Sequence, residues 1–144
     1  MEKIKKILNR EVISYIFFGI LTTVVNIVVS YVLKAFLHFE TNLSSTIGII
    51  SSILFAYFTN RKWVFESKAN TIKEKFSEFF KFILGRAFTM IVEIIGVFLL
   101  NDYFKLFFSV MGENTAFLIN KCIITVIVII LNFFISKFFA FKKD

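Results

Sequence analysis

Two copies of one pattern stand 76 residues apart in the sequence, FAYFTNRKWVF at 55–65 and LNFFISKFFAF at 131–141. The alignment matches Phe58 to Phe134, Arg61 to Lys137, Trp63 to Phe139 and Phe65 to Phe141. Each copy closes a long apolar run and passes into aromatic and basic residues. Similarity at a fixed period indicates two copies of one structural unit, so the sequence predicts two similar helical hairpins.

The apolar runs that lead into these copies dominate the composition. Of the 144 residues 58% are hydrophobic, with 22 Phe, and a soluble domain this small could not cover so much apolar surface. A bilayer core of roughly 30 Å needs about 20 helical residues. Four segments meet or approach that length, at about 12–33, 43–59, 79–100 and 116–136. We therefore expect an all-α membrane protein with four transmembrane helices in a single domain, 1–144.

Basic residues predict the orientation, because Lys and Arg in short loops resist translocation. They precede the first segment, lie between the second and third, and follow the fourth: Lys3, Lys5, Lys6 and Arg10; Arg61, Lys62, Lys68, Lys73, Lys75 and Lys81; Lys137, Lys142 and Lys143. The other two loops carry chiefly His38, Glu40, Asp102, Lys105 and Glu113. We expect a multi-pass protein of the cell membrane with both termini cytoplasmic. Its hairpins then point the same way, as parallel repeats about an axis along the membrane normal.

Two connections are themselves partly apolar. The segment 66–77 and the Phe cluster after it predict either a short interfacial helix leading into the third segment or a solvated linker. The loop 103–110 is aromatic, which predicts that it lies among headgroups or turns back toward the bilayer.

Polar residues inside the first two segments recur at helical spacing. They are Gly19, Thr22, Thr23, Asn26 and Ser30 in the first, and Ser44, Ser45, Gly48, Ser51, Ser52 and Thr59 in the second. Small residues allow helix backbones to approach closely, so helix packing is the favoured interpretation of both stripes.

The last two segments contain ionisable groups that packing alone does not require. The third carries Arg86 and Glu93, and the fourth carries Lys121 and Asn132. At 1.5 Å per residue, Glu93 and Lys121 lie at similar depths, roughly 10 and 8 Å below the outer boundary, which predicts an ion pair. A lock between helices and a substrate contact both remain open for this pair. Arg86 either extends to the interface or binds an anionic headgroup.

The repeated helix ends place Asn60, Arg61 and Trp63 in one copy and Lys137 in the other at the inner boundary. Anchoring at headgroup level and phosphate binding are both consistent with such residues.

Catalytic and metal-binding patterns are absent from the sequence. There is one His and one Cys, and no Gly-rich phosphate loop or plausible Ser/His/Asp set appears. The basic residues lie between apolar runs rather than on one face, which does not fit a nucleic-acid binder. We expect no metal, no cofactor and no enzymatic activity from this chain alone.

At these residues the sequence resembles the GtrA-like family of small four-helix membrane proteins. In that family each half ends in an Asn-Arg-x-Trp-x-Phe-like or Ser-Arg-Phe-x-x-Phe-like signature, and here these read NRKWVF at 60–65 and SKFFAF at 136–141. The resemblance runs from about residue 11 to 141 and includes FFGILTTVVN at 17–26 and FFKFILGR at 79–86. Two departures are Ala56, where the family often has Asn, and Lys137, where Arg is usual.

The resemblance implies a role in glycosylation of cell-surface polysaccharide or teichoic acid, by translocation of a polyprenyl-phosphate-linked sugar across the membrane. On this interpretation Arg86 and the helix-end cations hold phosphate, and Asn26, Glu93 and Asn132 contact sugar hydroxyls. The residues assigned to substrate or headgroup binding are Asn26, Asn60, Arg61, Arg86, Glu93, Lys121, Asn132 and Lys137. The expected partners are membrane lipid, the lipid-linked sugar, a membrane glycosyltransferase and further copies of the chain.

Two alternatives stay open at the level of sequence. A scaffold that recruits a membrane glycosyltransferase would use the aromatic faces for helix contacts. A small cation or drug exporter would use Glu93 as its coupling carboxylate, although other acidic groups inside the predicted spans are absent.

Overall fold

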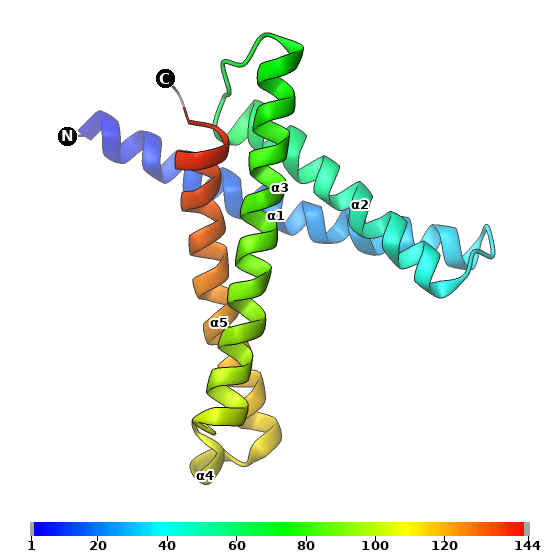
Figure 1. The fold of residues 1–144 in the computed structure, drawn as a ribbon, viewed down its shortest axis with the longest axis vertical. Helices are drawn as coiled ribbons and strands as arrows, with labels where there is room; N and C mark the ends of the chain where they lie inside the picture. The colour runs from blue at the N-terminus through cyan, green and yellow to red at the C-terminus, as the bar shows by residue number, and fades with distance from the viewer. Residues whose placement is uncertain (1, 143–144) are drawn as a thin grey trace. The chain divides into compact units, whose positions relative to one another are not determined.

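The computed structural model describes residues 2–142, apart from the side chains of residues 3, 4 and 8, and it consists of helices and short connections (Figure 1). The helices are α1 (Glu2–Ala35), α2 (Thr41–Thr59), α3 (Ile72–Phe98), α4 (Phe108–Met111) and α5 (Glu113–Ile135). Three π-helical turns extend them: η1 (Asn60–Val64), η2 (Leu99–Tyr103) and η3 (Ser136–Ala140). Lys143 and the side chain of Lys3, counted above among the orienting cations, lie outside the described residues.

Four of these helices are long and apolar enough to cross a membrane. The candidate spans are Lys5–Ala35, Thr41–Val64, Ile72–Tyr103 and Glu113–Ala140, and each contains one predicted segment. Among residues 2–142 there is no β-strand. The predicted fold class, an all-α protein with four membrane-crossing helices, is confirmed.

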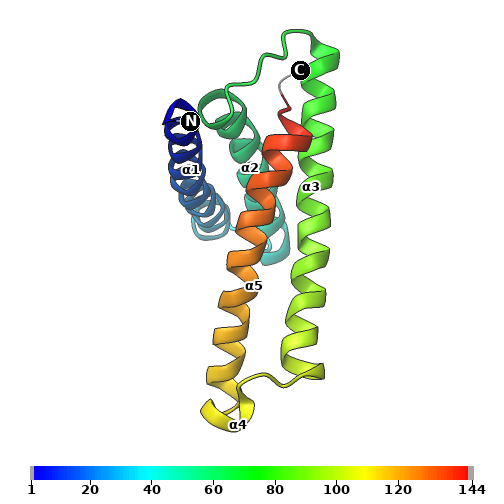
Figure 2. The same ribbon diagram turned by 90° about the vertical axis from the view of Figure 1, so that its left-hand side faces the viewer.

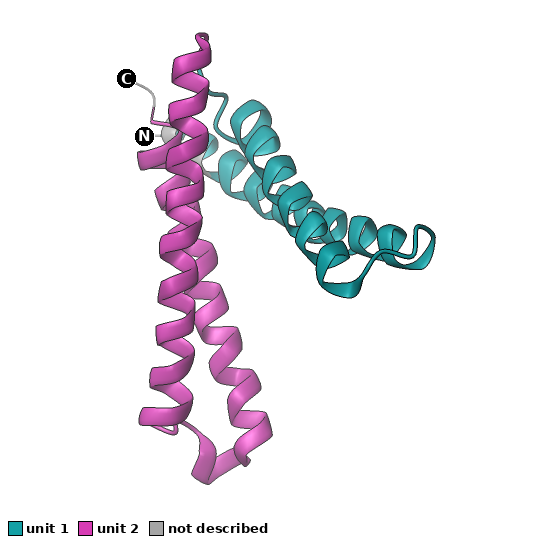
Figure 3. Cartoon of the chain, turned by 45° about the vertical axis from the view of Figure 1, so that its right-hand side comes forward, with its two compact units in different colours: residues 1–68, 143 teal, residues 69–142, 144 magenta. Residues whose placement is uncertain are grey.

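The helices pair in chain order into two compact units, drawn in two colours in Figure 3. Within the described residues, unit 1 comprises 2–68 and unit 2 comprises 69–142. In unit 1, α1 packs against α2, and in unit 2, α3 packs against α5 (Figures 1 and 2). Each unit is therefore a helical hairpin, as the sequence repeat predicts.

Gly48 sets the distance between the two helices of unit 1. A Cβ at this position would lie 2.8 Å from the Asn26 carbonyl oxygen and 2.0 Å from Ser30 Oγ on α1. The backbones of α1 and α2 approach too closely here for any side chain at position 48. The polar stripes of both helices thus meet at this contact, which agrees with the packing interpretation.

In unit 2 a buried hydrogen bond joins the two helices. Thr89 Oγ1 on α3 donates to Asn132 Oδ1 on α5 at 2.8 Å, and both side chains are buried. Because hydrocarbon offers no alternative partner, such a bond satisfies two polar groups at once and holds the helices in register.

The segment between the units contains neither a separate interfacial helix nor a linker reaching residue 77. α3 begins at Ile72, because Thr71 forms a capping box with Glu74 in which each side chain bonds the backbone of the other. Residues 72–77, including Phe76, therefore form the first turns of α3.

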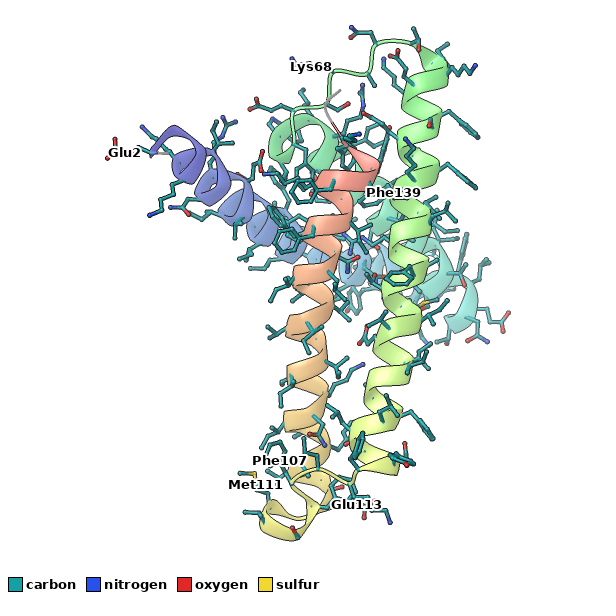
Figure 4. All side chains as sticks on the ribbon, turned by 60° about the vertical axis from the view of Figure 1, so that its left-hand side comes forward. Glu2, Lys68, Phe107, Met111, Glu113 and Phe139 are labelled. Carbon is teal, nitrogen blue, oxygen red and sulfur yellow. The ribbon has the colours of Figure 1, made fainter. Side chains whose placement is uncertain are left out.

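The aromatic loop of unit 2 turns sharply at the end of the hairpin. η2 ends at Tyr103, Phe107 adopts a left-handed conformation with φ 66°, and the single turn α4 follows. Figure 4 labels Phe107, Met111 and Glu113 at this end of the hairpin and Phe139 toward the other. The loop therefore contains a short helix, α4, rather than irregular structure throughout.

Candidate functional site

The repeated motif forms the same backbone structure in both units. Asn60 begins η1, and the Phe65 amide donates to the Asn60 carbonyl at 2.8 Å. Ser136 begins η3, and the Phe141 amide donates to the Ser136 carbonyl at the same distance. A π-turn places one extra residue in the turn, and such turns occur often at functional sites.

The two closing Phe rings are anchored alike. Phe65 and Phe141 are each 2% exposed. Phe65 contacts Tyr15 of α1 with ring centroids 6.3 Å apart, and Phe141 contacts Phe82 of α3 at 5.9 Å. Each hairpin therefore closes with an aromatic contact from its second helix to its first.

The internal repeat extends well beyond the quoted motif. Positions buried in the second helix of unit 1 recur 76 residues later in unit 2: Ser44 and Asn120, Gly48 and Ile124, Ser52 and Val128, Ala56 and Asn132, Tyr57 and Phe133, Asn60 and Ser136. The same face of each second helix thus points into its hairpin, although the residues on that face differ.

At the motif end of unit 1 there is a hollow of about 340 Å³. It is lined by Phe58, Arg61, Lys62, Trp63, Glu66 and Ser67. We call it the indole pocket. It combines two cations with an indole ring that stacks on Phe18 at 5.4 Å between centroids.

The charge of the indole pocket is positive, because its one carboxylate is already engaged. Glu66 pairs with Arg10 of α1 within unit 1. Lys62 Nζ lies 4.9 Å from the Trp63 ring centroid, close enough for a cation–π interaction. Two cations and a flat ring are suited to a phosphate with an attached sugar or lipid.

The predicted ion pair of unit 2 is present. Lys121 Nζ lies 2.6 Å from Glu93 Oε1, across the α3–α5 hairpin. The Lys121 side chain is 45% exposed and that of Glu93 is 30% exposed, so the pair lies at the edge of the hairpin rather than inside it. The two opposite charges therefore neutralise each other, and both side chains can still contact a group that approaches from outside the hairpin.

Arg86 lies one helical turn from the Thr89–Asn132 bond. Thr89 Oγ1 also contacts the Arg86 carbonyl at 3.1 Å. The guanidinium lies 5.2 Å from the Phe82 ring centroid, and within residues 2–142 no carboxylate pairs with it. A half-buried guanidinium with only a ring for a partner retains its hydrogen-bond donors for an anion.

The motif ends of the two hairpins differ at one equivalent position of their first helices. Phe18 lies three residues after Tyr15, and Gly85 lies three residues after Phe82, so Gly85 stands where unit 1 has the ring that stacks on Trp63. Unit 2 has a hollow of about 320 Å³ there, lined by the apolar residues Leu84, Gly85, Phe88, Ile135 and Phe139. A Cβ at Gly85 would lie 2.6 Å from Ile135 Cγ2, so the glycine allows α3 and α5 to approach closely at the edge of this hollow.

The remaining predicted residues have mainly local contacts. Asn26 accepts a hydrogen bond from Ser30 at 3.3 Å and lies at the Gly48 contact. Asn60 is buried, its Nδ2 donates to the Ala56 carbonyl at 2.7 Å, and its Oδ1 has no partner among the described residues. Lys137 lies 5.9 Å from the ring centroids of Phe133 and Phe138. Of the predicted set, the structure brings Glu93 and Lys121 together directly.

Sequence reasoning missed Asn120. This residue is 0% exposed, and its Nδ2 lies 3.0 Å from Asn101 Oδ1, 3.1 Å from the Leu106 carbonyl and 3.4 Å from the Leu100 carbonyl. It ties α5 to η2 and to the loop after it. The signal in the sequence is an amide within an apolar run, directly before Lys121.

Within residues 2–142 no three His, Cys, Asp or Glu side chains lie together in a way that could hold a metal ion. What the described residues do offer is a set of cations, amides and hydroxyls on apolar hairpins. A helical hairpin present twice, with basic and aromatic residues closing both copies, defines a small duplicated multi-pass membrane protein.

Comparison with known families agrees with this class. Residues 14–141 match the transmembrane domain of the GtrA/DPMS family, so the chain belongs to that family and the resemblance seen in the sequence is confirmed.

The chain is also similar, over nearly its full length, to curated proteins of bacteria. The chain is 32% identical to the cell wall teichoic acid glycosylation protein GtcA of Listeria monocytogenes and 33% identical to the protein of that name in Listeria innocua serovar 6a. Each match covers 99% of this chain and 98% of the relative. The uncharacterized membrane protein YwcD of Bacillus subtilis is 27% identical over 90% of this chain and 94% of its own length. No solved structure matches the chain significantly.

Proposed function

We propose that this protein translocates a polyprenyl-phosphate-linked sugar across the cytoplasmic membrane and thereby supplies glycosylation of teichoic acid or another cell-surface polymer. The whole chain 1–144 acts as one transmembrane domain with both termini cytoplasmic. The indole pocket is the observation that carries the proposal, because its two cations and its ring lie in one hollow where a spanning helix ends. The names of the Listeria relatives point to the same polymer.

The phosphodiester that joins lipid and sugar carries one negative charge, and it must be held where the lipid tail still reaches hydrocarbon. Arg61 and Lys62 supply charge-assisted hydrogen bonds at the membrane boundary, and Trp63 offers a flat face for a sugar ring. Engagement of Glu66 by Arg10 removes the one charge in the lining that would repel the ligand.

Unit 2 supplies polar groups inside the membrane. Arg86 is a donor on α3 that follows Gly85, a lining residue of the apolar hollow to which we assign the lipid tail, and Asn132 lies in the same part of the hairpin. The Glu93–Lys121 pair offers both a donor and an acceptor to sugar hydroxyls further along the helices. Lys137 completes the helix-end cations that hold phosphate, and the unpartnered Oδ1 of Asn60 is an acceptor for a headgroup hydroxyl. The chain itself carries out no bond chemistry.

The deciding experiment is translocation of a labelled polyprenyl-phosphate sugar by the purified protein in liposomes. Arg61→Ala and Lys62→Ala should each lower the rate about tenfold, the loss expected for one charge-assisted hydrogen bond. Lys68→Ala is the matched control, because Lys68 is exposed on the same connection but does not line the pocket. Arg61→Lys should keep more of the rate than Arg61→Ala.

Translocation that is absent from correctly folded protein would refute the proposal and favour a scaffold for a membrane glycosyltransferase. Equal rates in wild type and in the double variant Arg61→Ala/Lys62→Ala would remove the indole pocket from the mechanism.

A further inference from the structure

Unit 1 has a second, larger hollow at the opposite end of its hairpin. Its volume is about 640 Å³, and its lining residues are Ile27, Ser30, Tyr31, Lys34, Ala35, His38, Thr41, Ser44 and Ser45. We call it the loop pocket. Phe58 follows Ser45 by 13 positions, which corresponds to roughly 20 Å of α2, so the two pockets are separated by a large part of the bilayer. Small-molecule sites typically have volumes of about 300–1,000 Å³.

The loop pocket contains an ammonium group that no carboxylate neutralises. Lys34 Nζ bonds the hydroxyl of Thr41, and within residues 2–142 it forms no ion pair. Glu40, the nearest acid in the sequence, does not line the pocket. The net charge of the lining is therefore positive with His38 neutral, and this favours an anionic ligand.

A buried hydroxyl in the lining lacks a partner. Ser44 is 2% exposed, and its Oγ forms no hydrogen bond with any described residue. Thr46, two residues on, satisfies its hydroxyl with the Asn42 carbonyl four residues back, but Ser44 does not do the equivalent. A buried polar atom without a partner is costly, and a hydroxyl of a bound ligand would satisfy it.

The rest of the lining is apolar or bears hydroxyl groups. Ile27, Tyr31 and Ala35 form one wall from α1, and Ser45 adds a further hydroxyl from α2. An aromatic ring beside hydroxyls and one cation is suited to a sugar ring with a phosphate attached, because the sugar has both an apolar face and many hydroxyls.

The corresponding end of unit 2 is occupied by the protein itself. Asn120 stands at the position equivalent to Ser44, and its Nδ2 donates to Asn101 Oδ1 and to the Leu100 and Leu106 carbonyls, while its Oδ1 has no partner among the described residues. The connection 99–112 is long enough to fold over this position, whereas the connection 36–40 is not. The short connection of unit 1 thus leaves open a site that unit 2 fills.

We propose that the loop pocket is a second headgroup subsite, which binds the phosphosugar of the lipid-linked substrate at the outer face after translocation. The assignment to the outer face rests on the proposed function and its topology. Lys34 holds the phosphate, Ser44 Oγ bonds a sugar hydroxyl, and Tyr31 packs against the sugar ring.

The chain offers one natural reporter for each pocket, since it has a single His and a single Trp. His38 lines the loop pocket and Trp63 lines the indole pocket. In detergent-solubilised full-length protein, histidine-selective isotope labelling therefore gives one imidazole signal for the first pocket, and indole fluorescence reports the second. The probe is farnesyl phosphate carrying glucose, galactose or N-acetylglucosamine in turn, compared with farnesyl phosphate alone and with each free sugar phosphate.

We expect at least one lipid-linked sugar to shift the His38 signal in a saturable way, and more strongly than farnesyl phosphate alone does. Lys34→Gln should weaken that apparent affinity about tenfold and Ser44→Ala about threefold, while the Trp63 titration stays unchanged. Lys105→Gln is the matched control, because it removes the same charge from the connection of the other unit. A free sugar phosphate that shifts His38 as strongly as the lipid-linked form would overturn the assignment to a lipid-linked ligand.

The two reporters separate the two proposals. A Trp63 response without any His38 shift for the three probes would reject the second subsite and leave the proposed function standing. A His38 shift without a Trp63 response would support the subsite and count against the indole pocket. An equal His38 shift in wild type and Lys34→Gln would also overturn the subsite.

Discussion

Lys121 and Glu93 form a direct ion pair across the α3–α5 hairpin, with 2.6 Å between Nζ and Oε1, within the apolar sequences of two helices. Two charges in hydrocarbon are tolerable only together or with a third partner, because removing either one strands the other. The partial exposure of both side chains means that a partner outside the hairpin can reach them.

Breaking this pair should cost both stability and glycosylation. Glu93→Gln or Lys121→Met alone should lower the free energy of unfolding in detergent by about 1–3 kcal/mol, less than a fully buried pair would cost. The exchanged variant Glu93→Lys/Lys121→Glu should recover most of the stability but not the glycosylation of the surface polymer. Thermal unfolding and a polymer sugar assay measure the two effects. Recovery of both would show that the pair is only a lock between helices.

Gly48 should tolerate no side chain. In Gly48→Ala the new methyl group would meet the Asn26 carbonyl at 2.8 Å, which would force α1 and α2 apart at an expected cost of about 1–3 kcal/mol. Gly19→Ala on α1 is the control, since nothing lies within 4 Å of a Cβ there. That substitution should be neutral or stabilising, by up to about 1 kcal/mol. Unfolding midpoints of the two variants in one detergent provide the comparison.

Asn120 should hold the long connection of unit 2 in place. Asn120→Ala removes its donor from Asn101 and from two loop carbonyls, so we expect a loss of about 1–3 kcal/mol and faster proteolysis within 103–112. Asn114→Ala, at an exposed position of the first turn of α5, should change neither. Limited proteolysis with mass spectrometry of the fragments locates the cleavage; unchanged protection in Asn120→Ala would contradict this role.

The closing Phe rings should matter equally in the two hairpins. Phe65→Ala and Phe141→Ala each remove a ring that is 2% exposed, and we expect each to cost about 3–5 kcal/mol. Phe138→Ala, at a position 61% exposed, should cost less than about 0.5 kcal/mol. Expression level and unfolding midpoint measure the difference. A large loss of stability for only one of the two variants would mean that the two rings do not stabilise their hairpins equally.

The topology is open to a direct chemical test. In a Cys122→Ser background, Glu40→Cys should react with a membrane-impermeant maleimide added to intact cells, and Asn70→Cys should react only after the cells are opened. The reason is that we expect the basic residues 61–81 to keep their connection on the cytoplasmic side, while the connection 36–40 carries no Lys or Arg. The reverse labelling pattern would place both termini outside.

The sequence was sufficient for the fold class and for much of the candidate site. Four apolar segments of spanning length follow from hydropathy alone, and the repeat at 55–65 and 131–141 predicts the shared helix ends that η1 and η3 now show. Counting residues along two helices also placed Glu93 and Lys121 at one depth, because the rise per residue of an α-helix is constant. The predicted third segment begins at 79, whereas α3 begins at Ile72, because the capping box of Thr71 and Glu74 starts the helix before its apolar part.

The sequence by itself determined the properties that depend on one helix at a time, such as length, depth, charge and helix-end composition, because these follow from the order of residues alone. Only the tertiary structure decided which surfaces of different helices meet: the Gly48 contact, the burial of Asn120 under its loop, and the two pockets of unit 1. Whether a hollow forms depends on the register between two helices and on the length of the connection that folds over them. The register is set by contacts between residues far apart in the sequence, and no periodicity in the sequence records those contacts.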